Sequence, residues 1–278
     1  MRNAAIGFMD SGVGGLTVLR EVQRLLPTEK TVYLGDQQRL PYGPRPQSEV
    51  LTFTQQIAAF LQRHDHIKLL VLACNTATAA ALPTLQQTLA IPVLGVIAPG
   101  ARAAVQATKT HKIGVIATAG TVKSQAYQQT ILAQDPRNTV TSLACPEFVQ
   151  LAEANDLASP HAQQVVADKL APLQGTQIDT LILGCTHFPL LRQVIQRVLG
   201  PGVQLIDPGT ATANAVTALL DYWNLANSTG QPQPQATYYT TGEVTGFDRA
   251  ANHWLDTTPV HAQAIPLETL TQIDLEAE

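Results

Sequence analysis

Short apolar runs alternate with amphipathic segments along most of this chain, and no other feature constrains the fold as strongly. The segments Ala4–Met9, Thr31–Asp36 and Lys68–Cys74 are predicted to be buried strands. Between them apolar residues recur at helical spacing, as in residues 16–26. Strands that are apolar throughout and separated by helices are typical of parallel sheets covered by helices on both faces. The sequence therefore predicts an α/β fold.

The strand and helix pattern restarts near the middle of the chain. The segment IGFMDSG (Ile6–Gly12) resembles IGVIATA (Ile113–Ala119), and LVLACNT (Leu70–Thr76) resembles LILGCTH (Leu181–His187). The two pairs occur in the same order and at nearly the same offset. Chance similarity between buried strands is the alternative, but a cysteine coincides as well as the apolar run. We therefore expect an internal duplication that produces two lobes of similar build.

Composition and charge exclude several classes of protein. Of the 278 residues, 45% are hydrophobic and 14% are charged, with a net charge of −4, so no basic surface for nucleic acid or membranes is expected. No apolar run approaches the roughly 18 residues of a membrane span, and no signal peptide is recognised at the N-terminus. Three widely spaced cysteines form neither a disulfide framework nor a zinc motif, which indicates a reducing, cytoplasmic location.

Cys74 and Cys185 each follow a predicted strand and precede a predicted helix. Ligands of open α/β sheets bind outside the carboxyl ends of the strands, which is where both cysteines are expected. A helix N-terminus offers free N–H groups and a positive dipole end, so we expect a thiol pKa below the free value of about 8.5. The same groups bind carboxylates. A single such cysteine is as often structural as catalytic, but two at matching positions indicate function.

Three further motifs admit both a structural and a functional interpretation. DSGVGG (Asp10–Gly15) is a phosphate-binding turn, a helix cap, or the source of an active-site carboxylate at Asp10. LPYGP (Leu40–Pro44) is a rigid turn, or a loop that presents Tyr42 and Gly43 to a ligand. In CPEFVQLAE (Cys145–Glu153), Cys145 is interpreted as a packing residue, and Glu153 as a helix-surface residue or a proton relay.

Two thiols that face one another suit inversion at a stereocentre. One thiolate removes a proton from carbon, and the opposite thiol returns a proton to the other face. Such acid–base help contributes roughly 10²–10⁴ in rate when the groups titrate near the working pH. Asp10, or Glu153 together with His187, is placed to orient or relay the proton.

These motifs together carry a family resemblance. GFMDSGVGGLTVL, LPYG, ACNTATA, GVIATAGTVKSQAY, CPEFVQLAE and LGCTHFPLL resemble the glutamate racemases, within the cofactor-independent aspartate/glutamate racemase superfamily. The resemblance covers almost the whole chain. It implies interconversion of L- and D-glutamate, without cofactor or metal, to supply the D-isomer for peptidoglycan. Glu147 of CPEF stands where an apolar or neutral residue is expected.

The resemblance also assigns residues. It implies that Cys74 and Cys185 are the two acid/base residues, with Cys185 acting on L-glutamate and Cys74 on D-glutamate. Asp10, Glu153 and His187 match the assisting residues. The positions that match substrate contacts are Asp10, Ser11, Tyr42, Gly43, Asn75, Thr76, Thr118, Thr121, Thr186 and His187.

The family fold has two pseudo-symmetric lobes, each a mostly parallel sheet flanked by helices, with the active site in the cleft between them. On this basis residues 1–97 and 210–278 are expected to form the first lobe, completed by the C-terminal segment, and residues 98–209 the second. A homodimer is expected. Within the C-terminal part, residues 228–235 (STGQPQPQ) are predicted to be a surface linker.

Four other functions are weighed against this one. An aspartate racemase would share fold and mechanism. A cysteine-nucleophile amidohydrolase would use Cys185 with His187 and need one essential cysteine. A non-catalytic amino-acid-binding protein of two lobes would carry an export signal. A racemase dependent on pyridoxal phosphate would need a Schiff-base lysine, and none of the six lysines stands in a motif for one.

Overall fold

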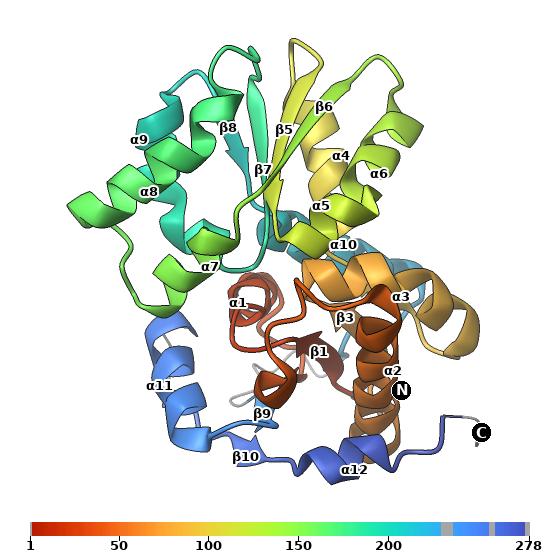
Figure 1. Ribbon diagram of the computed structural model, residues 1–278. Coiled ribbons are helices and arrows are strands. Elements are labelled where there is room, and N and C mark those ends of the chain that lie inside the picture. Colours follow the sequence, from red (N-terminus) through yellow and green to blue (C-terminus); the bar gives the residue numbers. More distant parts are fainter. Residues whose placement is uncertain (1, 229–235, 256–258, 276–278) are drawn as a thin grey trace.

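The computed structural model describes residues 2–228, 236–255 and 259–275. Two parallel sheets, each flanked by helices, lie one above the other (Figure 1). This arrangement confirms the predicted α/β fold. Of the linker predicted at residues 228–235, residues 229–235 lie outside the described part of the chain.

The first sheet has six strands in the order β10-β9-β2-β1-β3-β4. All of its pairings are parallel. The strands are β1 (Ile6–Asp10), β2 (Thr31–Gly35), β3 (Leu69–Leu72), β4 (Val93–Gly95), β9 (Thr237–Thr240) and β10 (Gln263–Ala264). The C-terminal part of the chain thus returns to extend the N-terminal sheet. The short strand β10 was not among the strands that the sequence predicted.

The second sheet has four parallel strands in the order β6-β5-β7-β8. They are β5 (Lys112–Ala117), β6 (Thr139–Ala144), β7 (Thr180–Gly184) and β8 (Gln204–Ile206). The first sheet repeats this order in β2-β1-β3-β4, so β1 corresponds to β5 and β3 to β7. This equivalence agrees with the duplication inferred from the sequence, and it places Cys74 and Cys185 after equivalent strands.

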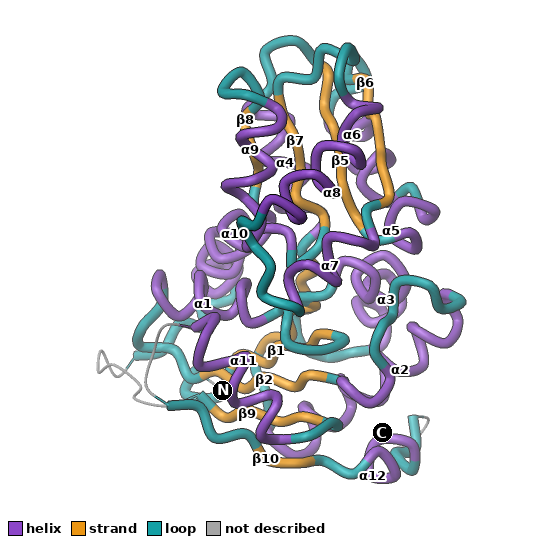
Figure 2. Tube along the Cα trace, turned by 60° about the vertical axis from the view of Figure 1, so that its left-hand side comes forward, coloured by secondary structure: helices purple, strands orange, loops and turns teal. Residues whose placement is uncertain are grey.

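Helices cover both faces of each sheet (Figure 2). We call each sheet with its covering helices a lobe, the first lobe being that of β1 and the second that of β5. Around the first sheet lie α1 (Leu16–Leu25), α2 (Gln47–Asp65), α3 (Asn75–Thr88), α11 (Val244–Leu255) and α12 (Leu267–Thr271). Around the second lie α4 (Ile97–Ala107), α5 (Ala119–Ser124), α6 (Ala126–Gln134), α7 (Pro146–Glu153), α8 (Pro160–Leu170) and α9 (Arg192–Leu199). Helix α10 (Pro208–Tyr222) packs against both α1 and α4, so it contacts both lobes.

Local signals in the sequence explain several helix boundaries. Ser159 caps α8 by accepting from the N–H of Ala162, and Pro160 occupies the first helical position, as predicted. Helix α3 continues through Pro83. The helix predicted after Cys185 begins as a 3₁₀ turn, η3 (Phe188–Leu191), before α9. Two further 3₁₀ turns are η1 (Gln37–Arg39) and η2 (Ala171–Leu173).

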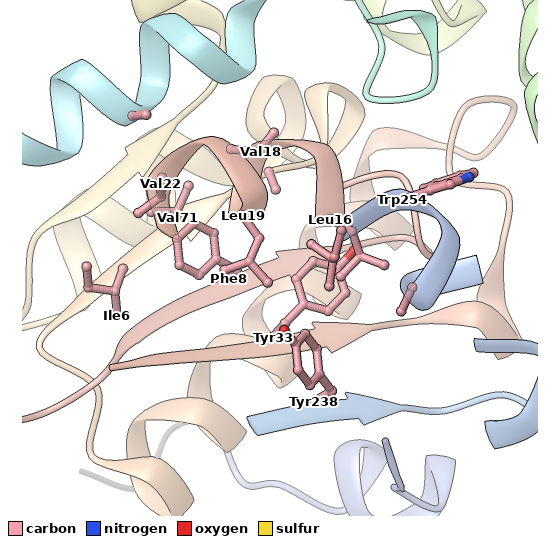
Figure 3. Packing of buried hydrophobic residues seen from close by; sticks show 14 of the residues in the cluster. Ile6, Phe8, Leu16, Val18, Leu19, Val22, Tyr33, Val71, Tyr238 and Trp254 are labelled. Carbon is pink, nitrogen blue, oxygen red and sulfur yellow. The ribbon is translucent and has the colours of Figure 1, made fainter. Parts of the chain in front are cut away.

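Apolar side chains fill both faces of the sheets. Figure 3 shows the cluster beneath α1, where Phe8 of β1 and Val71 of β3 pack against Leu19 and Val22 of the helix. These four side chains are buried completely. Burying apolar surface stabilises a fold by about 25 cal/mol per Å², so this layer fixes the strand ends that carry the site. Among the described residues, no helix combines the length and apolar character needed to cross a membrane.

Candidate active site

A cavity of about 490 Å³ lies where the ends of the two sheets face each other. Cys74 enters it from the first lobe and Cys185 from the second. The other lining residues that the sequence had singled out are Asp10, Ser11, Tyr42, Gly43, Asn75, Thr76, Thr118, Glu153, Thr186 and His187. No lysine is among the described residues that line this cavity, so no Schiff-base amine faces it.

Cys74 is held by the start of helix α3. It is the N-cap residue, and its Sγ accepts a hydrogen bond from the backbone N–H of Ala77 at 3.4 Å. The thiol lies 3.9 Å from Ser11 Oγ. The first-turn N–H groups of Asn75 and Thr76 have no partner within the helix, which leaves donors beside the sulfur.

Asp10 lies at the end of β1 and is 1% exposed. Its Oδ2 accepts from the N–H of Gly12 at 3.1 Å. Burial raises the pKa of Asp10, while His187 and the backbone N–H groups of residues 11, 12 and 15 oppose this rise. Helix α1 has no side-chain cap, so Asp10 and Ser11 do not cap it. Of the three interpretations of DSGVGG, the carboxylate that faces a cavity is the one the geometry favours.

Cys185 has a different set of neighbours. Its Sγ lies 3.8 Å from Nδ1 of His187, whose ring is buried. On the other side of that ring, Nε2 lies 3.5 Å from Oε1 of Glu153. This is an ion-pair distance without good hydrogen-bond geometry, because Nε2 makes no hydrogen bond to the described residues. The rings of His187 and Trp254 from α11 form a T-shaped pair with 5.6 Å between centroids.

The electrostatics of the two sulfur sites differ from the expectation. Burial raises the pKa of the Cys74 thiol to about 12, and Asp10 acts in the same direction. The prediction of a lowered pKa is therefore wrong for Cys74, because removal from water outweighs one N–H donor. For His187 burial lowers the pKa, but Cys185 and Glu153 outweigh it and raise the pKa to about 10. At neutral pH this favours a neutral thiol at Cys74 and an imidazolium beside Cys185.

Direct contacts join the two lobes beside the cavity. Thr17 of α1 donates to the carbonyl of Thr186 at 3.0 Å, and the hydroxyls of Thr76 and Thr118 lie 3.0 Å apart. A Cβ added to Gly14 would come within 2.2 Å of Thr186 Oγ1. The glycine in this turn is needed because the second lobe approaches the backbone so closely.

Three residues singled out from the sequence are placed differently from the others. One lines the cavity but has its hydroxyl bonded elsewhere, and two lie outside the lining. Tyr42 lines the cavity, yet its hydroxyl donates to the buried carboxylate of Asp36. Thr121 is absent from the lining and lies behind it, 3.3 Å from the hydroxyl of Thr76. Cys145 is completely buried and outside the lining, in agreement with a packing role.

Part of the lining was not foreseen. The additional residues are Leu40, Pro41, Pro44, Ala119, Pro146, Val149 and Gln150. Pro146, Val149 and Gln150 share helix α7 with Glu153. They stand seven, four and three residues before it, respectively, which is the spacing of one helix face. Once Glu153 was a candidate, this periodicity could have found them.

Comparisons with known proteins identify the family. The model of the Asp/Glu/Hydantoin racemase family matches residues 6–216. A glutamate racemase of Levilactobacillus brevis is 60% identical over 271 residues, 98% of each chain. Among solved structures, a Bacillus anthracis glutamate racemase is 42% identical with a TM-score of 0.92, covering 96% of this chain and 99% of its own. One from Francisella tularensis in complex with D-glutamate is 32% identical with a TM-score of 0.89, covering 97% and 100%. The chain therefore belongs to the Asp/Glu/Hydantoin racemase family of isomerases, where it groups with the glutamate racemases.

Proposed function

We propose that this enzyme interconverts L- and D-glutamate by proton transfer at Cα between Cys74 and Cys185, without a cofactor. The observation that carries the proposal is that these two sulfurs, one from each lobe, line a single cavity. A carbon bound between them has one sulfur on each face. Inversion requires that arrangement, because the proton leaves one face and returns to the other.

In the direction from L-glutamate, Cys185 is the base, as the family resemblance implies. Acting as a thiolate beside His187, it takes the Cα proton, and the C–H electron pair stays on the carbon. The neutral Cys74 thiol then delivers its proton to the opposite face and becomes a thiolate. The sulfurs have exchanged protonation states, so the product enzyme is set for D-glutamate. The raised pKa of Cys74 supports a protonated thiol there, and the raised pKa of His187 supports an imidazolium beside Cys185.

Polar groups around the cavity can hold the two carboxylates and the ammonium of glutamate. The free N–H groups at the start of α3 suit a carboxylate. Hydroxyls of Ser11, Thr118 and Thr186 add donors that line the cavity. Asp10 supplies the negative charge for the ammonium. Thr121 supports Thr118 and Thr76 from behind.

We propose glutamate rather than aspartate as the substrate because the similar proteins compared above are glutamate racemases. The relative and the two solved structures compared above, which cover 96–98% of this chain, are glutamate racemases. An aspartate racemase would use the same two sulfurs on a shorter substrate. The proposal extends to a homodimer in the cytoplasm that supplies D-glutamate for peptidoglycan, as the family resemblance implies.

Deuterium incorporation tests the proposal. Purified enzyme, with no added cofactor, is incubated in deuterium oxide with L-glutamate, D-glutamate or L-aspartate. We expect solvent deuterium at Cα of the inverted glutamate product. Cys74→Ser and Cys185→Ser should each lower racemisation by roughly 10²–10⁴, while Cys145→Ser serves as the matched control. Full activity in either of the first two variants would refute the two-thiol scheme, and equal turnover of aspartate would refute the specificity.

A further inference from the structure

In one hydrogen bond between the lobes, the acceptor residue lines the cavity and the donor residue does not. Tyr127 of α6, in the second lobe, donates through its hydroxyl to Oδ1 of Asn75 at 2.7 Å. Asn75 is the first residue of α3 in the first lobe and lines the cavity, whereas Tyr127 is absent from the lining. Both side chains are buried, at 2% and 4% exposure. The proton-transfer scheme makes no use of Tyr127.

A glycine makes room for the ring of this tyrosine. A Cβ at Gly184 would lie 3.0 Å from Cε2 of the Tyr127 ring, which is tighter than ordinary contact. Gly184 directly precedes Cys185, so the ring crosses the strand end that carries the second sulfur. The backbone of the second lobe therefore leaves space for the Tyr127 side chain to reach from α6 to Asn75.

The direction of the hydrogen bond decides what Asn75 offers to a ligand. Burial raises the pKa of Tyr127 well above its usual range, so the phenol stays neutral and keeps its proton to donate. The oxygen and the NH₂ of an asparagine carboxamide lie in one plane and point to opposite sides of the Cβ–Cγ axis. With Oδ1 engaged by Tyr127, the NH₂ is the part left for the cavity. A substrate carboxylate accepts hydrogen bonds from NH₂ and is repelled by a carbonyl oxygen.

We propose that Tyr127 is a positioning residue that fixes the Asn75 carboxamide with its NH₂ toward the substrate carboxylate. The inference rests on the proposed function, since it assumes that an amino-acid carboxylate binds beside α3. The hydrogen bond crosses between the lobes, so a side chain of the second lobe orients a carboxylate donor of the first. Without Tyr127 the amide is free to turn its oxygen inward.

Removal of the hydroxyl alone gives the first test. In Tyr127→Phe, we expect KM and the dissociation constant of D-glutamate to rise about 3- to 10-fold, the range for one neutral hydrogen bond, with a smaller change in kcat. Tyr238→Phe is the matched control: it also loses a buried phenol, but Tyr238 lies on β9 outside the cavity lining. Its KM should stay at the wild-type value, and thermal melting of both variants checks that they fold.

A double-mutant cycle shows whether Tyr127 acts through Asn75. Asn75→Ala should weaken binding by itself, and adding Tyr127→Phe should change it less than twofold further. Equal effects of Tyr127→Phe with and without Asn75 would overturn the inference, as would an unchanged KM in the single variant. A wild-type protein that neither binds nor racemises glutamate would instead refute the proposed function, so the two failures are distinct.

Asn75→Asp tests the NH₂ group without touching the tyrosine. The aspartate keeps an oxygen that accepts from Tyr127, but it presents oxygen to the cavity. We expect D-glutamate binding, measured by calorimetry, to weaken at least tenfold. Binding at the wild-type level would show that the NH₂ of Asn75 does not face the substrate, and the proposal would then be wrong.

Discussion

The two sulfur sites sit at equivalent strand ends, yet their surroundings differ. Cys74 caps a 14-residue α-helix and lies beside the hydroxyl of Ser11. Cys185 is followed by a 3₁₀ turn and lies beside the imidazole of His187, which Glu153 supports. Duplication thus preserves the positions of the sulfurs but not their partners. The difference gives the two sulfurs unequal surroundings: burial raises the pKa of the Cys74 thiol to about 12, whereas Cys185 lies beside an imidazole whose own pKa is raised to about 10.

Among the predicted changes, substitution of His187 should have the largest effect on activity, because this imidazole distinguishes the surroundings of Cys185 from those of Cys74. In His187→Gln, we expect kcat/KM to fall roughly 10²–10⁴, the range for acid–base assistance. Because L- and D-glutamate are equally stable in water, kcat/KM must fall by the same factor in both directions. The asymmetry should appear in the primary deuterium kinetic isotope effects. Because proton transfer at Cys185 becomes slower, the isotope effect with α-deuterated L-glutamate should rise. The isotope effect with α-deuterated D-glutamate should fall. A symmetric change would show that His187 does not serve Cys185 in particular.

The stability of the folded enzyme should depend on pH through the same residue. The folded pKa of His187, about 10, lies above the unfolded value of about 6.5. Its contribution is therefore fully present below pH 6.5 and is lost as pH rises towards 10. Between pH 7 and 9 the wild type should lose at most about 1.4 kcal/mol per pH unit more than His187→Gln. Urea unfolding at each pH measures this, and parallel curves for the two proteins would contradict it.

The residues that directly precede the two cysteines also differ in how tightly they are packed. Gly184 precedes Cys185, and a Cβ there would lie 2.8 Å from the carbonyl of Ile116 and 3.0 Å from the Tyr127 ring. We expect Gly184→Ala to destabilise the protein by about 1–3 kcal/mol through overpacking. The equivalent Ala73→Gly should cost only about 0.5–1 kcal/mol. Denaturant midpoints measure both, and equal costs would mean that the two strand ends are interchangeable.

The smallest effect is expected at Ser11. Its hydroxyl is 3.9 Å from Cys74 Sγ, which is a long contact even for sulfur. Ser11→Ala should lower kcat/KM by about 3- to 10-fold, the loss of one weak polar contact. Steady-state kinetics in both directions check this value. A loss as large as that of His187→Gln would show that Ser11 is a full counterpart of the histidine.

The sequence determined the fold class and the location of the site. Alternation of apolar runs and helix patterns is enough to predict parallel sheets, because buried strands and covering helices have distinct periods. The repeated cysteine predicted that both sulfurs stand at strand ends, and most of the polar residues chosen from nearby motifs line the cavity. These features depend on residues that are close together in the chain, so the sequence alone is enough to predict them.

Only the tertiary structure decided what surrounds each sulfur. The raised pKa of Cys74 follows from burial between two lobes, which no local motif records. The same holds for the hydroxyl of Tyr42, which is taken by Asp36, and for Tyr127, which reaches Asn75 from the opposite lobe. Desolvation and contacts between lobes depend on how distant segments pack, and the spacing of residues along the chain does not specify that packing.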